Sequence, residues 1–457
     1  MSDIHAPFWV ALMNHHGDRE QRARLWNGYL GWKLPPRLRG EVPQSGWPQL
    51  VVTAPPGGWP DLSEEDKSLM DDLAAANGGH PSWDDRHYMD FSGNTFESAV
   101  DLSDCTLVDA NFSDTCFKAE VHLEATRFFA QSWFRATTFE SGAYFHRTFF
   151  EADADFSQAQ FRGYGGFTGV RFNGGATFAG SSFRWNARFD DSKFVETYFS
   201  AGAAPLILAD FRNAHFPHGA SFRNVVFGED PEHTTKRLRP RRLVDFSDAR
   251  FQATTDFRQA VFNGVPAFFN CSLHEDANFS GVRWPRARPA PDRIEYAIRA
   301  WERLELMMSE LEKPLDRHRF YGRKMRTRRL SDGPLLRSLN WLFDVTSDYG
   351  WSVPRAAVSW FIHWLVGAIL LYANTAQNAV ESDALRLFTA ALGTAFANAH
   401  AFLALGAEGG YLESGRALMQ EHNHVGLFAG VGVVQTILGP VFVFLLLLTV
   451  RNRFRLA

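Results

Sequence analysis

The chain has very few cysteines, and their scarcity excludes two ways of stabilising a fold. Its 457 residues include 3 cysteines, Cys105, Cys116 and Cys271, and these form no CxxC pair. A disulfide framework needs an even set of cysteines, and a zinc knuckle needs closely spaced thiolates. We therefore expect neither device, and we expect the protein to reside in a reducing compartment.

Enzyme motifs are also missing from the sequence. It contains no P-loop, no dinucleotide-binding glycine pattern, no nucleophile elbow and no HExxH. The pairs His15–His16 and His422–His424 have no third ligand spaced around them, so we expect no metal site. Asp and Glu recur at surface positions of a repeat, where solvation explains them without catalysis. The sequence therefore predicts a protein that is not an enzyme, with no catalytic residues and no cofactor.

The N-terminal region lacks the features of a secretory leader. Residues 1–22 contain no basic segment followed by a long apolar one. We therefore expect no cleavable signal peptide, and any membrane targeting must reside elsewhere in the chain.

Phenylalanine, by contrast, is abundant and regularly spaced. The chain has 42 phenylalanines, and from residue 117 to 194 a Phe or Leu recurs at alternating steps of five and six residues. The period is therefore eleven residues, or twenty-two for two pairs. The series starts at looser spacing at Phe91, resumes at Phe211 and restarts at Phe246 after a basic insert at 228–244.

The spacing continues across a degenerate stretch at 200–210. Because Phe211 lies 22 residues after Phe189, we expect this stretch to occupy part of a coil without shifting the register. Eight phenylalanines of the regular part form the predicted repeat core: Phe134, Phe139, Phe145, Phe150, Phe156, Phe161, Phe167 and Phe172.

The spacing predicts a solenoid rather than a helix. Steps of five and six residues walk around a 3.6-residue turn and give no single apolar face. If each unit forms one side of a square, four units make a coil of about 22 residues, and identical positions stack at roughly 4.8 Å. Phe then packs on Phe from coil to coil, often with an Ala two residues before it, and about eight coils fill residues 88–286.

The repeat units resemble those of the pentapeptide-repeat family. The segments ANFSD, ADFSQ, ATFAG and ANFSG match its A-(D/N)-(L/F)-(S/T)-G unit, and the resemblance covers nearly half of the chain. It implies a β-solenoid in the form of a right-handed quadrilateral β-helix. Some members of the family mimic DNA through a strongly acidic rod. Here Arg162 and Arg188 are mixed with the acids, and KRLRPRR (236–242) is interpreted as a basic surface loop, so we expect no nucleic-acid partner.

Two apolar stretches near the C-terminus predict transmembrane helices at about 354–372 and 425–450. Basic residues precede the first stretch at 317–330 and follow the second, whereas the intervening residues 373–424 carry more acidic than basic side chains. The positive-inside rule then leaves both termini in the cytoplasm. We therefore expect a multi-pass protein of the inner (cytoplasmic) membrane, in contact with membrane lipid.

The segment at about 383–405 lies between the two predicted spans and is rich in Ala and Gly. A third span would leave the two basic flanks on opposite sides, so we expect a re-entrant or interfacial helix. The span–short helix–span order resembles the pore module of tetrameric potassium channels, although the TVGYG filter is missing. His363 and Gln435 are polar side chains within the predicted spans, and either a function or the hydrogen bonds of an oligomer would explain them.

The remaining segments connect these parts. Residues 1–87 are predicted to form a helical and loop cap, 287–350 an amphipathic and basic linker, and 351–457 the membrane domain. The helix that starts at Pro291 has an apolar face, which packs either on the last coil or on the same helix of a neighbouring subunit. Five basic residues of the linker either contact lipid headgroups or only orient the chain: Arg323, Lys324, Arg326, Arg328 and Arg329.

Two functional hypotheses follow from these predictions. The first is a non-enzymatic, membrane-anchored scaffold whose cytoplasmic β-helix presents flat faces to an unidentified protein partner. The alternative is a channel-like homo-oligomer with a two-span pore domain, for which the cytoplasmic β-helix acts as a gate or sensor. The sequence favours the scaffold, because structural repeat dominates it and no chemistry is recognisable.

Overall fold

The computed structural model describes most of the chain as two compact units, Met1–Met307 and Met308–Ala457. The described residues are 6–13, 18–35, 52, 54–55, 58–81, 89–195, 208–228, 244–285, 288–289, 291–378, 384–400, 416–418, 420 and 425–454. The pairs His15–His16 and His422–His424, most of the predicted insert, and its KRLRPRR motif lie outside the described residues.

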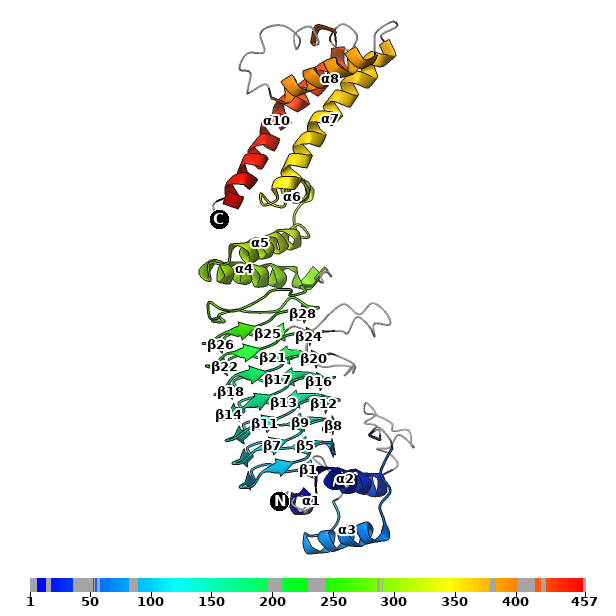
Figure 1. Ribbon diagram of the computed structural model, residues 1–457, viewed down its shortest axis with the longest axis vertical. Helices are drawn as coiled ribbons and strands as arrows, with labels where there is room; N and C mark the ends of the chain where they lie inside the picture. Colours follow the sequence, from blue (N-terminus) through cyan, green and yellow to red (C-terminus); the bar gives the residue numbers. More distant parts are fainter. Residues whose placement is uncertain are drawn as a thin grey trace. The chain divides into compact units, whose positions relative to one another are not determined.

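The first unit is built around four parallel β-sheets of seven strands each, which form the four sides of a β-helix (Figure 1). One sheet comprises β1 (Met89–Asp90), β5 (Ala110–Asn111), β9 (Ser132–Trp133), β13 (Ala154–Asp155), β17 (Ala176–Thr177), β21 (Ala209–Asp210) and β25 (Val244–Asp245). The next comprises β2 (Thr95–Phe96), β6 (Cys116–Phe117), β10 (Thr138–Phe139), β14 (Gln160–Phe161), β18 (Ser182–Phe183), β22 (His215–Phe216) and β26 (Arg250–Phe251).

The third and fourth sheets complete each coil. The third comprises β3 (Val100–Asp101), β7 (Val121–His122), β11 (Ala143–Tyr144), β15 (Gly165–Gly166), β19 (Ala187–Arg188), β23 (Ala220–Ser221) and β27 (Thr255–Asp256). The fourth comprises β4 (Thr106–Val108), β8 (Arg127–Phe129), β12 (Phe149–Phe150), β16 (Arg171–Phe172), β20 (Lys193–Phe194), β24 (Val226–Phe227) and β28 (Val261–Phe262). Isolated parallel bridges such as Asp245↔Ala267 and Val261↔Arg283 add a further layer on every side. Seven strands and one bridged layer agree with the expected eight coils.

Stacked phenylalanines fill the inside of the β-helix. Paired positions in the regular part lie 22 residues apart, as Phe139↔Phe161 does. Phe156 lies between Phe134 and Phe178, with ring centroids 4.6 and 4.9 Å away and nearly parallel planes. The eight residues of the predicted repeat core are all buried. Rings also meet edge to face within a coil, so each ring contacts neighbours both along and across the axis.

Corner residues turn the chain from one side of the coil to the next. Asp114, Ala136 and Gln158 have φ of 57°, 54° and 59°, the left-handed conformation of a tight turn. The residue after such a corner is often a buried Thr whose hydroxyl reaches the neighbouring coil. Thr115 donates to the Phe91 carbonyl at 2.8 Å, and Thr137 donates to the Phe112 carbonyl at 2.6 Å. These bonds give a donor from the next coil to carbonyls that also accept a hydrogen bond within their own turn.

The expected register across the degenerate stretch is wrong. Phe211 does not stack on Phe189 but on Phe178, 33 residues earlier, with ring centroids 5.1 Å apart. Phe189 stacks instead on Phe222. The cause is that a coil contains two eleven-residue periods, so eleven extra residues preserve the local pattern while shifting the coil by half a turn. The extra residues fall between β20 and β21, mostly outside the described residues.

The second long insert leaves the β-helix at the equivalent place. It falls between β24 and β25, and Ala209 pairs with Val244, 35 residues later. The predicted break in register is therefore present. In both cases the chain leaves after the fourth sheet and returns in the first, so both inserts depart from the same edge of the β-helix.

Helices close both ends of the β-helix. The first end is covered by α1 (Ala6–Met13), α2 (Arg19–Lys33) and α3 (Glu64–Ala76), and the Trp26 indole donates to the Thr106 carbonyl at 2.6 Å. At the other end, η1 (Pro291–Arg293) leads into α4 (Ile294–Glu310). The Trp301 ring lies 5.9 Å from Trp284 of the last coil. Of the two partners expected for this helix, α4 therefore packs on the last coil.

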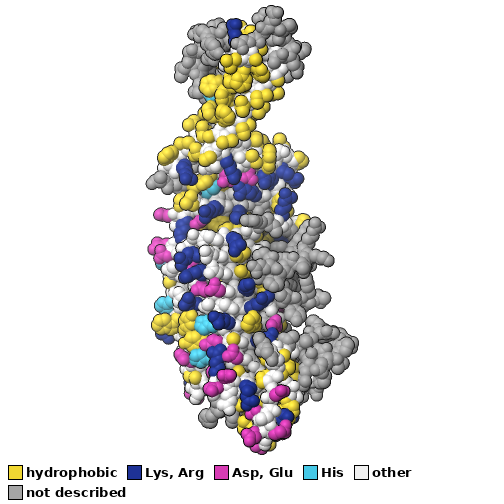
Figure 2. All heavy atoms as spheres, turned by 45° about the vertical axis from the view of Figure 1, so that its right-hand side comes forward, with side chains coloured by type: hydrophobic (Ala, Val, Ile, Leu, Met, Phe, Trp, Pro, Cys, Tyr) yellow, Lys and Arg dark blue, Asp and Glu magenta, His cyan; other side chains and the backbone are white. Residues whose placement is uncertain are grey.

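The second unit consists of helices. They are α5 (Pro314–Arg328), α6 (Pro334–Ser347), α7 (Val353–Asn378), α8 (Ala384–Ala399) and α10 (Val425–Phe454). Two are long and apolar enough to cross a membrane, over Val353–Thr375 and Phe428–Phe454, which agrees with the predicted spans. In the most apolar stretch of each helix only 22% and 11% of the residues, respectively, are buried, so most of their apolar side chains face outward. Apolar side chains cover much of the visible surface of this unit (Figure 2).

We expect Phe156→Ala to destabilise the β-helix by about 3 to 5 kcal/mol, because it leaves a cavity between two stacked rings. The free energy of unfolding of the full chain in detergent micelles, from urea titration followed by circular dichroism, measures this loss. Phe149→Ala is the matched control, since Phe149 faces outward with 38% of its surface exposed. We expect less than about 1 kcal/mol there. Equal losses in the two variants would contradict the stacking argument.

Candidate functional site

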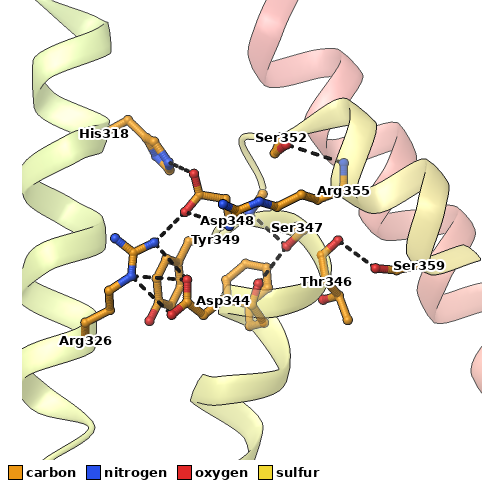
Figure 3. A network of polar contacts seen from close by, with 12 residues as sticks. His318, Arg326, Asp344, Thr346, Ser347, Asp348, Tyr349, Ser352, Arg355 and Ser359 are labelled. Carbon is orange, nitrogen blue, oxygen red and sulfur yellow. Dashed lines mark hydrogen bonds and ion pairs between the residues drawn. The ribbon is translucent and has the colours of Figure 1, made fainter.

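The strongest concentration of buried polar groups in the second unit lies where α5, α6 and α7 meet (Figure 3). Proline at the first position starts both α5 and α6, since its missing N–H and fixed φ suit the first helical turn. The two helices pack against each other. Their facing sides are polar. We call the residues joined there, which are drawn in Figure 3, the juxtamembrane network: His318, Arg326, Asp344, Thr346, Ser347, Asp348, Tyr349, Ser352, Arg355 and Ser359.

Arg326 is the centre of the juxtamembrane network. Its guanidinium donates to both carboxylate oxygens of Asp344 at 2.8 to 3.2 Å, and to Asp348 at 2.7 Å. Arg329 adds a bond of 3.3 Å to Asp344. On the far side of Asp348, Arg355 of α7 lies 3.7 Å away. Asp344 of α6 thus joins Arg326 of α5 and Arg329 just after its end, and Asp348, just after α6, connects α5 with α7.

These contacts stabilise the charged forms of Arg326 and Asp348. The hydrogen bond to Asp344 raises the pKa of Arg326 despite its partial burial. Hydrogen bonding to His318, together with Arg326 and Arg355, holds the pKa of Asp348 below its usual value. A bidentate arginine–carboxylate pair is geometrically specific as well as strong. The network therefore favours the charged forms of Arg326 and Asp348, and its ion pairs join α5 to α6.

A tight reversal of the backbone lies beside the network. Asp348, Tyr349 and Gly350 have φ of 49°, 55° and 79°, so three successive residues adopt the left-handed conformation. The Tyr349 hydroxyl donates to Asn340 at 2.8 Å, and burial raises the pKa of this phenol to about 12. Asn452, near the end of α10, donates to the Gly350 carbonyl at 2.8 Å. The reversal therefore joins α6 to the beginning of α7 and the end of α10.

The five basic residues proposed for lipid headgroups have different surroundings. Arg326 and Arg329 are engaged by Asp344, so the structure gives them an internal partner. Arg323 is partly buried, and burial lowers its pKa to about 10. Lys324 lies over the Tyr321 ring, 5.2 Å from its centre, while Arg328 is exposed. Contact of these residues with lipid stays a prediction, and it is weakest for Arg326 and Arg329.

The short helix α8 packs against both long helices, and it runs antiparallel to α7. Its beginning lies near the end of α7, where the rings of Phe388 and Tyr372 are 5.7 Å apart. After its end, His400 Nε2 accepts a hydrogen bond of 3.1 Å from the Trp360 indole. Helix α8 has 16 residues, about 24 Å at 1.5 Å per residue. It therefore follows most of the predicted first span without being long enough to form a third.

Small residues bring these three helices close together. A Cβ on Gly439 of α10 would collide with the Ala399 carbonyl of α8, and one on Gly367 of α7 would collide with the Gln435 amide. Ala368, Ala391 and Ala395 lie in the apolar core that the helices share. Such close approach is typical of helices that pack within a membrane.

Several buried polar groups among these helices have no hydrogen-bond partner among the described residues. Gln435, one of the two predicted intramembrane residues, is 2% exposed, and both polar atoms of its amide are unpaired. His363, the other, stacks on Phe442 at 4.9 Å with Nε2 unpaired. Asn398 and Thr394 of α8 each have one unpaired buried atom. Sequence reasoning missed these two, because single polar residues in an Ala-rich helix give no distinctive pattern.

A cleft lies in the first unit, between the helical cap and the β-helix. It has a volume of about 800 Å³, and its charged lining includes Arg24, Arg127, Arg171 and Glu151. The arginines have local partners: Arg24 pairs with Asp66 at 3.0 Å and Arg127 with Glu151 at 3.6 Å. The hydrogen bond from Arg24 lowers the pKa of Asp66 to about 2. The described part of the chain holds no cluster of three residues that could bind a metal ion.

No family model, no curated protein and no solved structure matches this chain. The β-solenoid therefore rests on the repeat and the four parallel sheets, and the function must be argued from the sites alone.

We expect Asp344→Asn to loosen the α5–α6 pair, since it removes the carboxylate charge that two arginines share. A charge-assisted hydrogen bond contributes about 2 kcal/mol, so amide hydrogen exchange across 334–350 should quicken about 30-fold. Exchange measured by mass spectrometry on the full chain tests this. Asp316→Asn is the control, because Asp316 pairs with Arg319 on an exposed turn of α5. Unchanged exchange at 334–350 would show that the network does not hold α5 against α6.

Proposed function

We propose that this protein is a membrane-anchored, non-enzymatic scaffold of the pentapeptide-repeat type, with its β-helix in the cytoplasm. The observation that supports a membrane anchor is the low burial of α7 and α10. Side chains such as Ile369, Val434 and Phe444 are 50 to 62% exposed on helices of mean apolar character. The core helix of a soluble protein would bury them. A hydrocarbon surrounding accounts for the exposure without further assumptions.

The outer surface of the β-helix supports a scaffold rather than a reaction centre. Outward side chains pair between adjacent coils, as Lys118 does with Glu97 at 2.6 Å and Arg223 with Asp256 at 3.2 Å. His122 stacks on Tyr144 with ring centroids 4.9 Å apart. Basic and acidic side chains are interspersed over the face seen in Figure 2. A long, flat surface with its charges largely paired is suited to shape-based protein recognition.

The mixed charge also bears on nucleic-acid mimicry. A DNA mimic needs a one-signed acidic surface. On this β-helix Arg162 pairs with Glu140, and Arg258 with Asp256 at 2.7 Å. Arginines are therefore interspersed with the acidic side chains on this surface, which favours a protein partner over the nucleic-acid-binding target of a DNA mimic.

The proposed topology predicts which residues a membrane-impermeant maleimide can reach. In a Cys116→Ser background, we expect Glu97→Cys of the β-helix to react in inside-out vesicles and not in intact spheroplasts. We expect Arg386→Cys, at the exposed beginning of α8, to react in the opposite pattern. Cys105 and Cys271 are buried and should contribute little background. Labelling of Glu97→Cys in spheroplasts would contradict a cytoplasmic β-helix.

The packing of α8 favours a second candidate function, a channel-like oligomer. Helix α8 runs back along α7 and also contacts α10. A short helix packed in this way between two long ones has the order of a re-entrant pore segment. The unpaired amide of Gln435 adds a buried polar group in the same region. Polar groups inside a membrane are costly unless they serve a conduction path or an intersubunit contact.

We expect the channel-like form to appear as a tetramer or pentamer by mass in detergent, with conductance in a planar bilayer that Gln435→Leu changes. Ile437→Leu is the control, because Ile437 lies on the same helix with 62% of its surface exposed. A monomer without conductance would rule out the channel and leave the scaffold. A conductance that both variants leave unchanged would remove Gln435 from the path.

A further inference from the structure

Helix α6 is amphipathic in the reverse sense of a helix on a soluble protein. Its polar residues are inside: Asn340, Asp344 and Ser347 are at most 9% exposed and form one stripe of the helix. Its apolar residues are outside: Leu335 is 74% exposed and Leu339 is 54% exposed. The rest of the outer face is also apolar and 44 to 59% exposed: Leu336, Trp341, Leu342 and Val345. We call these six residues the outer face of α6.

Ion pairing explains why the polar stripe is inside. Asp344 accepts from Arg326 and Arg329, and Asn340 donates to the Met325 carbonyl at 3.1 Å. The Ser347 hydroxyl donates to the Phe343 carbonyl and accepts from the Gly350 N–H at 3.0 Å. These bonds hold the polar side of α6 against α5 and the reversal, so the apolar side cannot turn inward without breaking them.

The outer face lies at the level where the long helices end. The reversal that follows α6 is bonded to Asn452 of α10, and Arg355 in the first turn of α7 lies beside Asp348. Arg451 and Arg453 occupy the last turn of α10. Basic residues at both helix ends mark the height of the lipid headgroups if these helices span the bilayer.

Helix α7, which packs against α6, also exposes apolar side chains. Beyond the reversal, Val358, Phe361 and Ile362 of α7 are 47 to 57% exposed, and α6 packs against α7. Whatever covers α7 therefore extends towards α6. For a membrane-spanning α7 the covering is lipid.

We propose that α6 is an interfacial helix, and that its outer face lies among the acyl chains just below the headgroups of the cytoplasmic leaflet. An apolar face beside basic residues is the composition of helices that lie in this zone. Arg337, on the polar edge of the helix, and Arg328 at the end of α5 are exposed, so both are available to headgroup phosphates. The juxtamembrane network then connects the bilayer surface to the helices that precede it. This inference rests on the proposal that α7 spans the membrane.

Nitroxide scanning in proteoliposomes tests the inference. Single cysteines in a Cys116→Ser background are placed at Leu335, Leu339 and Leu342 on the outer face, and at Arg337 on the polar edge. The accessibility of each label to oxygen, which dissolves in lipid, is compared with its accessibility to a water-soluble nickel chelate. We expect the ratio of oxygen to nickel accessibility to be at least several-fold higher for the three outer-face labels than for the Arg337 label. Accessibility would then vary along α6 with the helical period.

Two further labels separate the failure of this inference from that of the proposed function. Ile369→Cys reports on α7, and Glu97→Cys provides the aqueous reference. An Ile369 label in lipid with outer-face labels in water would overturn the interfacial helix and leave the anchor intact. An Ile369 label in water would overturn the membrane anchor itself.

A second copy of the chain is the competing occupant of the outer face. In that case the Leu339 label would be shielded from both oxygen and nickel, and its spectrum would broaden through spin–spin coupling between subunits. Dilution with unlabelled protein would remove the broadening. That result would overturn the assignment of lipid.

Discussion

The β-helix depends on a single constraint: equivalent side chains must stack on one another at the spacing of parallel strands. Each strand has only two or three residues and would have no stability alone. It exists because a ring such as Phe156 has a parallel partner on each side and edge-on partners within the coil. Corner residues with positive φ and the Thr hydroxyls that follow them then satisfy the backbone between strands.

The same constraint explains why sequence alone specified this part so well. Phe at steps of five and six residues fits no helix, and the period gave the coil length, the core and the number of layers. What the period could not specify was the phase of a coil. Two periods make one coil, so eleven extra residues before Leu208 leave the Phe pattern intact and still move Phe211 from above Phe189 to above Phe178. Only pairing in space distinguishes these two arrangements.

The second unit was less predictable for a different reason. Its two candidate spans are visible in the sequence as apolar stretches, but the juxtamembrane network joins residues on separate helices, such as Arg326 and Asp344. No local spacing indicates such a pair. The sequence singled out Arg326 and Arg329 for lipid because cations before a span often meet headgroups, whereas the folded chain uses both to hold α6. Whether apolar or polar residues of α6 face outward is likewise decided by these tertiary ion pairs.

The common departure edge of the two inserts has a consequence for how such a protein can change. Because both leave after the fourth sheet and return in the first, they lie at one corner of the β-helix, and all four sheets keep their seven strands paired without interruption. New sequence added at that edge alters neither the stacked rings nor the other surfaces. A chain built in this way separates two kinds of variation: whole coils change its length in steps of one strand spacing, and segments inserted at one edge change its surface while its length stays the same.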